Sequence, residues 1–213
     1  NYSLKNSNNI NRTILGSGLD VDFTINLPTS IFGYEANHRI TPLISYNYRA
    51  KKVQGNIPIF DTEDKFDDII TFAALTSGER YTGLDRITNA NDITLSLESS
   101  YRAIDAIDDD KDLLNMRIAQ SFYTDDEVVS DTASTNYETR KSYSDIAASI
   151  DVALGKYVIS SSAQFNPDTS KLVKKENSLT YTSNSRKFIT LSVSDDGTKE
   201  TDKFYGAYPL TDS

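Results

Sequence analysis

Few side chains in this sequence could support catalysis. His38 is the single histidine, so any Ser-His or metal-His mechanism would rest on it alone. No Gly-x-Ser-x-Gly motif marks a nucleophilic serine. The chain has no cysteine, which excludes disulfides and thiolate metal sites within it. We therefore expect neither enzyme activity nor a cofactor.

Carboxylates are the other candidates for chemistry, and they gather in two places. The first cluster consists of Asp61, Glu63, Asp64, Asp67 and Asp68. Clustered carboxylates suit Ca²⁺ or Mg²⁺, but the spacing of an EF-hand is absent. The second cluster runs from Asp108 to Asp112 around Lys111. We interpret both as solvated loop surfaces and expect no metal.

The elements that carry these residues are predicted by an alternation of apolar and polar side chains with a period of two. This pattern is typical of β-strands with one apolar face. It predicts an all-β, antiparallel up-and-down meander of about eight strands, with no convincing helix. The predicted strands cover residues 19–27, 40–48, 93–102, 114–122, 146–154, 157–165, 179–183 and 188–194.

The predicted connections differ in length. Links of moderate length are expected at 28–39 and 166–176, short turns at 103–112, 155–156 and 184–186, and long loops after Arg49 and Thr124. Alternate links of a meander lie at opposite ends, so one end would carry mainly short turns and the other long loops. Transmembrane β-barrels have this asymmetry, with short periplasmic turns and long extracellular loops.

Two architectures fit this alternation, a transmembrane β-barrel and a soluble β-sandwich or solenoid. Charged residues of the best strands, Asp22, Glu98, Arg102, Arg117 and Asp151, all fall on the polar face. An Arg or Lys facing lipid would cost about 2–4 kcal/mol at the bilayer midplane. Aromatic residues lie near strand ends on the apolar face, where an interfacial girdle belongs; these are Tyr46, Tyr48, Tyr101, Phe122, Tyr157 and Phe165. Both observations favour the barrel.

The charge of the chain limits its partners. There are 31 acidic and 22 basic residues, so nucleic acid is not an expected partner. Arg49, Arg102 and Arg117 could attract lipid phosphates. We favour ion pairs with Glu98, Asp151 and similar carboxylates inside a barrel.

The stretch from Ile57 to Asp92 is the longest interval without a clean strand pattern. Its apolar content is too high for a solvated linker, so we expect a structured loop that packs on something. Gly83 permits a backbone turn that other residues cannot adopt, and the neighbouring ion pair of Asp85 and Arg86 could hold this loop in place. The role we expect is packing, not substrate binding.

Several motifs in this part of the chain resemble one family. The first is a strand that contains Pro42 and ends in Tyr-x-Tyr-Arg at residues 46–49, followed by Pro58-x-Phe60-Asp61. The most specific is Gly78-Glu79-Arg80-Tyr81-Thr82-Gly83-Leu84-Asp85-Arg86-Ile87, after which Ala90-Asn91 opens the next strand. A further segment is Ile118-Ala119-Gln120-Ser121-Phe122-Tyr123. Together they resemble the C-terminal half of the LPS-assembly family LptD, also called organic solvent tolerance protein.

The resemblance implies that residues 1–213 are part of a large barrel domain in the Gram-negative outer membrane, with a long extracellular loop at about residues 50–92. It also implies a translocon that inserts lipopolysaccharide into the outer leaflet. The implied partners are an LptE-type lipoprotein plug and, through an N-terminal domain outside this sequence, a periplasmic LPS-bridge protein. We therefore expect a segment of a longer polypeptide. The alternatives are another outer-membrane barrel, either a passive channel or a receptor, and a soluble β-sandwich binding module.

The residues expected to pack the loop against the plug are carried over from the same motifs. They are Phe60, Asp61, Gly83, Leu84, Asp85 and Arg86.

Overall fold

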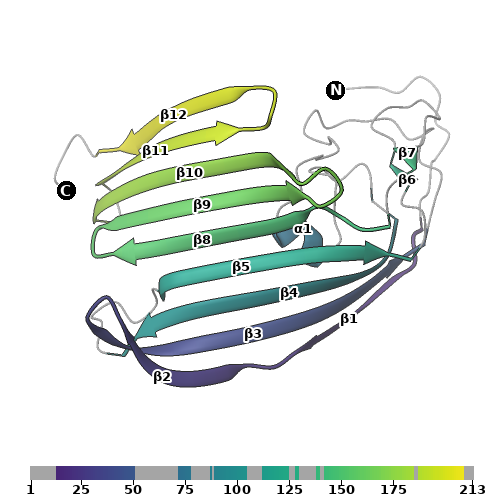
Figure 1. Cartoon of the computed structure of the whole chain (residues 1–213), viewed down its shortest axis with the longest axis horizontal. Helices are drawn as coiled ribbons and strands as arrows, with labels where there is room; N and C mark the ends of the chain where they lie inside the picture. The colour runs from purple at the N-terminus through teal and green to yellow at the C-terminus, as the bar shows by residue number, and fades with distance from the viewer. Residues whose placement is uncertain are drawn as a thin grey trace, which may run out of the picture.

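A computed structural model describes residues 13–50, 72–77, 87, 89–104, 112–124, 128–129, 138–139, 142–184 and 187–208. These residues form one large antiparallel sheet of ten strands, a separate pair of very short strands and one short helix (Figure 1). The all-β antiparallel meander predicted from the alternation is confirmed.

The chain enters the sheet through β1 (Gly16–Asp22) and β2 (Ile25–Ile31), which both pair with β3 (Tyr34–Arg49). The meander then continues through β4 (Ala90–Ala103), β5 (Asp112–Tyr123), β8 (Ile146–Leu154), β9 (Tyr157–Asn166), β10 (Lys171–Asn184), β11 (Lys187–Asp195) and β12 (Glu200–Ala207). The two short strands, β6 (Val128–Val129) and β7 (Glu138–Thr139), pair with each other. From β3 to β12 the order of strands in the sheet follows their order in the chain, with β6 and β7 set apart between β5 and β8.

The prediction of one strand over residues 19–27 is wrong, because the strand is interrupted at Phe23 and Thr24. The pairs Asp22↔Leu43 and Ile25↔Ile40 place Phe23 opposite Pro42. Proline has no backbone N–H and cannot complete a ladder there. The missing hydrogen bond explains the interruption, and the Thr24 and Thr41 hydroxyls, 3.1 Å apart, join the strands beside it.

Two predicted links are also wrong. Residues 28–39 do not form a connection, because β2 and β3 are joined by the two-residue turn Phe32-Gly33. Both turn residues have positive φ, 52° and 83°, as a tight hairpin of this kind requires. Residues 166–176 are not a loop either, since β10 begins at Lys171. The turn at Gly155-Lys156 is confirmed.

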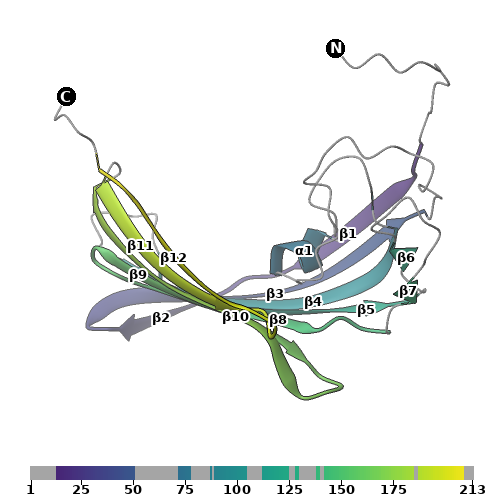
Figure 2. The ribbon, with the colours of Figure 1, turned by 90° about the horizontal axis from the view of Figure 1, so that it is seen from above.

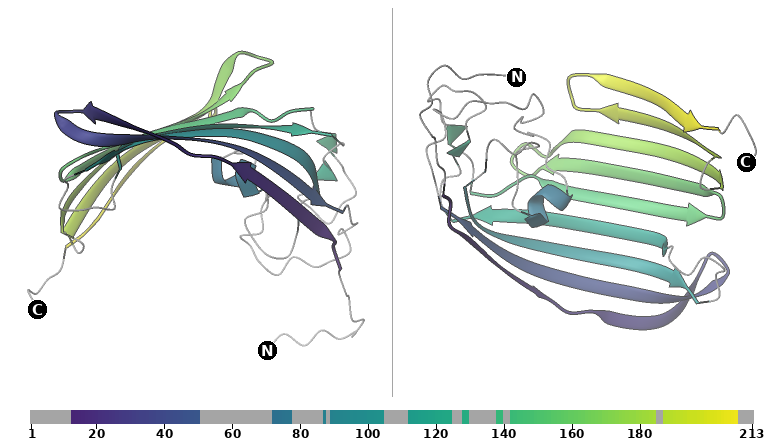
Figure 3. Two further views of the ribbon diagram at one scale, coloured as in Figure 1. Left: turned by 90° about the horizontal axis from the view of Figure 1, so that it is seen from below. Right: turned by 180° about the vertical axis from the view of Figure 1, so that it is seen from behind.

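The sheet is strongly curved, and the helix α1 (Phe72–Ser77) lies on its concave face (Figures 2 and 3). This helix corrects the prediction of a helix-free chain. With six residues it is too short to show a periodic pattern in the sequence. Among the described residues, no helix is long and apolar enough to cross a membrane.

Candidate functional site on the concave face

The two faces of the sheet have opposite chemistry, and the polar face is the more buried one. The concave face carries small polar residues that are almost inaccessible, including Thr94 at 0 % exposure, and also Ser45, Ser100, Ser121, Gln164 and Thr190. The convex face carries exposed aliphatic residues such as Leu95 at 45 % and Ile150 at 40 %. A soluble domain has the reverse distribution.

The aromatic residues of the convex face lie where the sequence places them. Tyr46, Tyr48 and Phe122 are exposed near the end that carries the long connections, and Tyr157 is exposed near the end of the Gly155-Lys156 turn. Tyr101 and Phe165 are half-buried. The alternative of a β-sandwich does not fit the described residues, since Ile93, Leu95, Leu97 and Ile150 are exposed instead of packed between two sheets.

Helix α1 is anchored to the concave face by one apolar side chain. Leu75 is 2 % exposed and packs against Ala119 of β5 and Ala147 of β8, with Phe72 partly buried beside them. The two alanines leave room for a leucine between neighbouring strands. Small side chains at these positions therefore form the seat of the helix.

A pair of buried hydroxyls completes this seat. Thr94 Oγ1 donates a hydrogen bond to the backbone oxygen of Leu75 at 3.1 Å and lies 2.6 Å from Ser121 Oγ. A hydroxyl has a single hydrogen, so Ser121 is the donor to Thr94. The terminal turn of a helix has free carbonyl groups, and here the wall of the sheet satisfies one of them.

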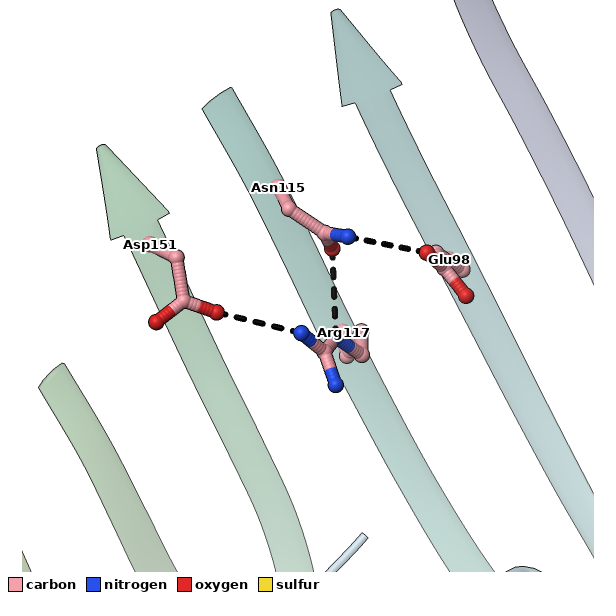
Figure 4. Close-up of polar contacts among 4 residues, drawn as sticks. All are labelled: Glu98, Asn115, Arg117 and Asp151. Atoms are coloured by element: carbon pink, nitrogen blue, oxygen red, sulfur yellow. Dashed lines mark hydrogen bonds and ion pairs between the residues drawn. The ribbon is translucent and has the colours of Figure 1, made fainter. Parts of the chain in front are cut away.

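A charged network lies on the same face, across β4, β5 and β8 (Figure 4). The Arg117 guanidinium donates to Asp151 Oδ2 at 3.1 Å and to Asn115 Oδ1 at 3.2 Å. Asn115 in turn donates to Glu98 Oε1 at 2.9 Å. The guanidinium carbon also lies 5.9 Å from the ring centroid of Phe72, so the network borders α1.

The predicted pairing of the inward arginines is confirmed for Arg117 with Asp151. Arg102 pairs instead with Asp112, at 3.0 Å, because a register shift beside Tyr101 brings this carboxylate opposite it. The side chains of the Arg117 pair are about one-third exposed, 35 % each. At that exposure, such pairs contribute little to stability, so the network serves mainly to keep this face polar.

His38 has a structural environment on the convex face. Its ring stacks on Tyr101 with centroids 4.1 Å apart and planes 7° from parallel, and its Nε2 lies 2.8 Å from Ser99 Oγ. Within the described part of the chain, no carboxylate contacts this His-Ser pair. The third group of a catalytic triad is thus not provided there.

The residues predicted to pack the long loop, Phe60, Asp61, Gly83, Leu84, Asp85 and Arg86, lie outside the described residues. The acidic cluster at residues 61–68 lies outside them too, as does most of the second cluster. Sequence reasoning missed the seat of α1. The sequence feature that corresponds to this seat is a group of small residues on the polar face of β4, β5 and β8. At these positions Thr94, Ser121, Ala119 and Ala147 stand in place of the larger polar side chains found elsewhere on that face.

Comparison with known proteins gives a consistent result. The family described as "LptD: LPS transport system D" matches residues 1–201. The LPS-assembly protein LptD of Pseudoalteromonas atlantica is 32% identical over 151 residues, which is 70% of this chain and 18% of that protein.

Two further relatives carry the same name. That of Shewanella frigidimarina is 30% identical over 187 residues, covering 87% of this chain and 23% of that protein. That of Paraburkholderia xenovorans is 29% identical over 187 residues, covering 81% and 23%. The chain thus spans about a fifth of the length of these curated relatives.

Proposed function

Because the chain belongs to the LptD family of LPS transport proteins, we propose that it forms part of the wall of an outer-membrane barrel that inserts lipopolysaccharide into the outer leaflet. The longer protein would work with a lipoprotein plug in the lumen and receive lipopolysaccharide from a periplasmic bridge protein. Insertion of a lipid breaks no covalent bond, so the proposed role is transport and not catalysis.

The observation that carries this proposal is the inverted burial of the sheet. A sheet face that exposes Leu95, Leu97 and Ile118 is expected to contact lipid. The opposite face holds the Arg117–Asp151 pair and the buried hydroxyls, which suit a hydrated or protein-filled lumen. A closed barrel would also remove the two free edges, β12 and the β1–β2 strand.

Helix α1 supports a structural role for the long connection between β3 and β4. We propose that this connection, about residues 50–92, is extracellular and reaches back into the lumen. Phe60, Asp61, Gly83, Leu84, Asp85 and Arg86 would pack it against the plug. The seat of Leu75 on Ala119 and Ala147 supplies one fixed point for such a connection.

The test uses the full-length protein in its own cells. Affinity purification in mild detergent should recover a lipoprotein in equimolar amount, and depletion of the protein should reduce lipopolysaccharide at the cell surface while it accumulates on the periplasmic side. Depletion of an unrelated outer-membrane porin is the control. An outer-membrane protein that copurifies with no lipoprotein and leaves surface lipopolysaccharide unchanged would instead be a channel or receptor.

A further inference from the structure

A cavity of about 570 Å³ lies where β10 meets β11 and where β12 ends. Its lining includes Tyr181, Lys187, Ile189, Phe204, Gly206 and Tyr208. The cross-strand pairs Tyr181↔Ile189 and Ile189↔Gly206 place three of these residues in one row. This row has the parity of the exposed Leu179 and Leu191, so the cavity opens on the convex face.

The hollow exists because the row ends in glycine. Tyr181 and Ile189 project bulky side chains, and Gly206 projects none. A Cβ added at Gly206 would lie 2.6 Å from the backbone oxygen of Phe188, which is too close for any side chain. The gap is therefore built into the backbone, and its walls are apolar: Phe204 is 72% exposed and Ile189 is 48% exposed.

A positive charge stands at one end of this apolar hollow. Lys187 Nζ lies 4.8 Å from the ring centroid of Tyr208. Lys187 is the first residue of β11, where the row of apolar side chains stops. Lysine and tyrosine at this depth are typical of the membrane interface, where an ammonium meets head groups while its stem lies on apolar surface. An apolar groove with an ammonium group at its polar end matches a lipid that has an acyl chain and a negatively charged head group.

We propose that this cavity binds an anionic phospholipid, with one acyl chain between Ile189 and Phe204 and the phosphate at the Lys187 ammonium. The inference rests on the proposed function, because it requires the convex face to lie in a bilayer. The two-residue turns at 32–33 and 155–156 lie at this end of the sheet, where Asn184 of β10 also pairs with Lys187 of β11. Short turns are typical of the periplasmic end of a barrel, so we assign this end to the periplasmic side. That side faces the phospholipid leaflet, which favours a phospholipid over lipopolysaccharide.

The test uses the full-length protein in nanodiscs that contain phosphatidylglycerol diluted in phosphatidylcholine. Native mass spectrometry then measures the phosphatidylglycerol retained after gentle extraction. Lys187→Gln should lower this retention about fivefold, as expected for one lysine beside anionic lipid, about 1 kcal/mol. Lys187→Arg should preserve it. Lys171→Gln, which removes a lysine at the opposite end of β10, should leave it unchanged.

A second pair of variants tests the hollow without altering charge. Ile189→Trp fills the cavity and should lower retention to a similar degree, whereas Leu191→Trp adds the same ring to the same strand outside the cavity lining and should have no effect. Equal retention by the native protein, Lys187→Gln and Ile189→Trp, with all three inserted in nanodiscs, would overturn the lipid site alone. Failure of the native protein to insert would overturn the proposed function and the lipid site together.

Discussion

Thr94 is a small side chain that links two parts of the chain far apart in sequence. Its hydroxyl is fully buried, accepts from Ser121 and donates to Leu75. A buried hydroxyl is costly unless its hydrogen bonds are made. The hydroxyl therefore favours the conformation in which α1 lies on the sheet.

Thr94→Val keeps the shape of the side chain and removes both hydrogen bonds. We expect α1 to be held less firmly by about 1–3 kcal/mol, because the Leu75 carbonyl and the Ser121 hydroxyl lose a buried partner. Hydrogen exchange of peptides covering residues 72–77 in the full-length protein measures this loss. Thr190→Val is the control, since it breaks a hydrogen bond to Thr180 on the same face. Equal protection of α1 in both variants would contradict the assignment.

Asp196 closes the turn between β11 and β12. Its Oδ1 accepts hydrogen bonds from the Thr198 hydroxyl at 2.7 Å and from the backbone N–H groups of Thr198 and Lys199 at 2.9 and 2.8 Å. These donors, the hydroxyl first, lower the pKa of Asp196 from 3.8 to about 2. The ionised carboxylate accepts these hydrogen bonds more strongly than the protonated acid does.

The pH dependence of this turn follows from the lowered pKa. The stabilisation should be complete above pH 3.8, the unperturbed value, and should be lost as the pH falls through about 2. Hydrogen exchange of the turn peptide, corrected for its intrinsic pH dependence, should show this loss in the native protein. Asp196→Asn should show a smaller titration in that range, and what remains should come from Asp195, whose pKa is also lowered, first by the backbone N–H of Gly197 and then by Lys175. A native-like titration in the variant would exclude Asp196 as its source.

At the scale of elements, the seat of α1 depends on the volume available between β5 and β8. Ala147→Leu should displace the helix, because Leu75 already fills the space above Ala119 and Ala147. Overpacking of this kind costs about 1–3 kcal/mol. Ala153→Leu makes the same change further along the same face of β8. Faster proteolysis near α1 in the first variant only is the expected result, and similar cleavage of both would refute the packing argument.

The sequence predicted the two faces of the sheet better than its connections. Alternation fixes which parity is apolar, as at Ile93, Leu95 and Leu97, because a strand has a period of two. The start of β10 was missed because Lys174, Lys175 and Glu176 are polar on both faces and the strand projects beyond the apolar band there. β12 was missed for the same reason.

The seat of α1 could not be derived from local patterns. Contacts of Leu75 with Ala119 and Ala147 join residues more than forty positions apart, and nothing in the spacing of these residues marks them as neighbours. The register of β5 and β8, Ala119↔Ala147, supplies the missing information. The predicted packing residues of the long loop remain predictions.

At the scale of the whole molecule, the segment has an apolar convex face and two free edges. Residues 1–213 expressed alone in water should therefore form soluble aggregates or precipitate, and a mild detergent should disperse them. Sedimentation velocity with and without detergent measures the association. A stable monomer in detergent-free buffer would contradict the assignment of the convex face to lipid.

The interruption opposite Pro42 has a consequence for the length of the strand. The pairs on both sides of it, Asp22↔Leu43 and Ile25↔Ile40, have the same register. The interruption therefore contains two residues and leaves the alternation of faces along the strand unchanged. One inserted residue at this point would turn Leu19 and Val21 toward the lumen and Asp20 and Asp22 toward lipid. The number of residues in this interruption is thus fixed by the face that each flanking residue must present.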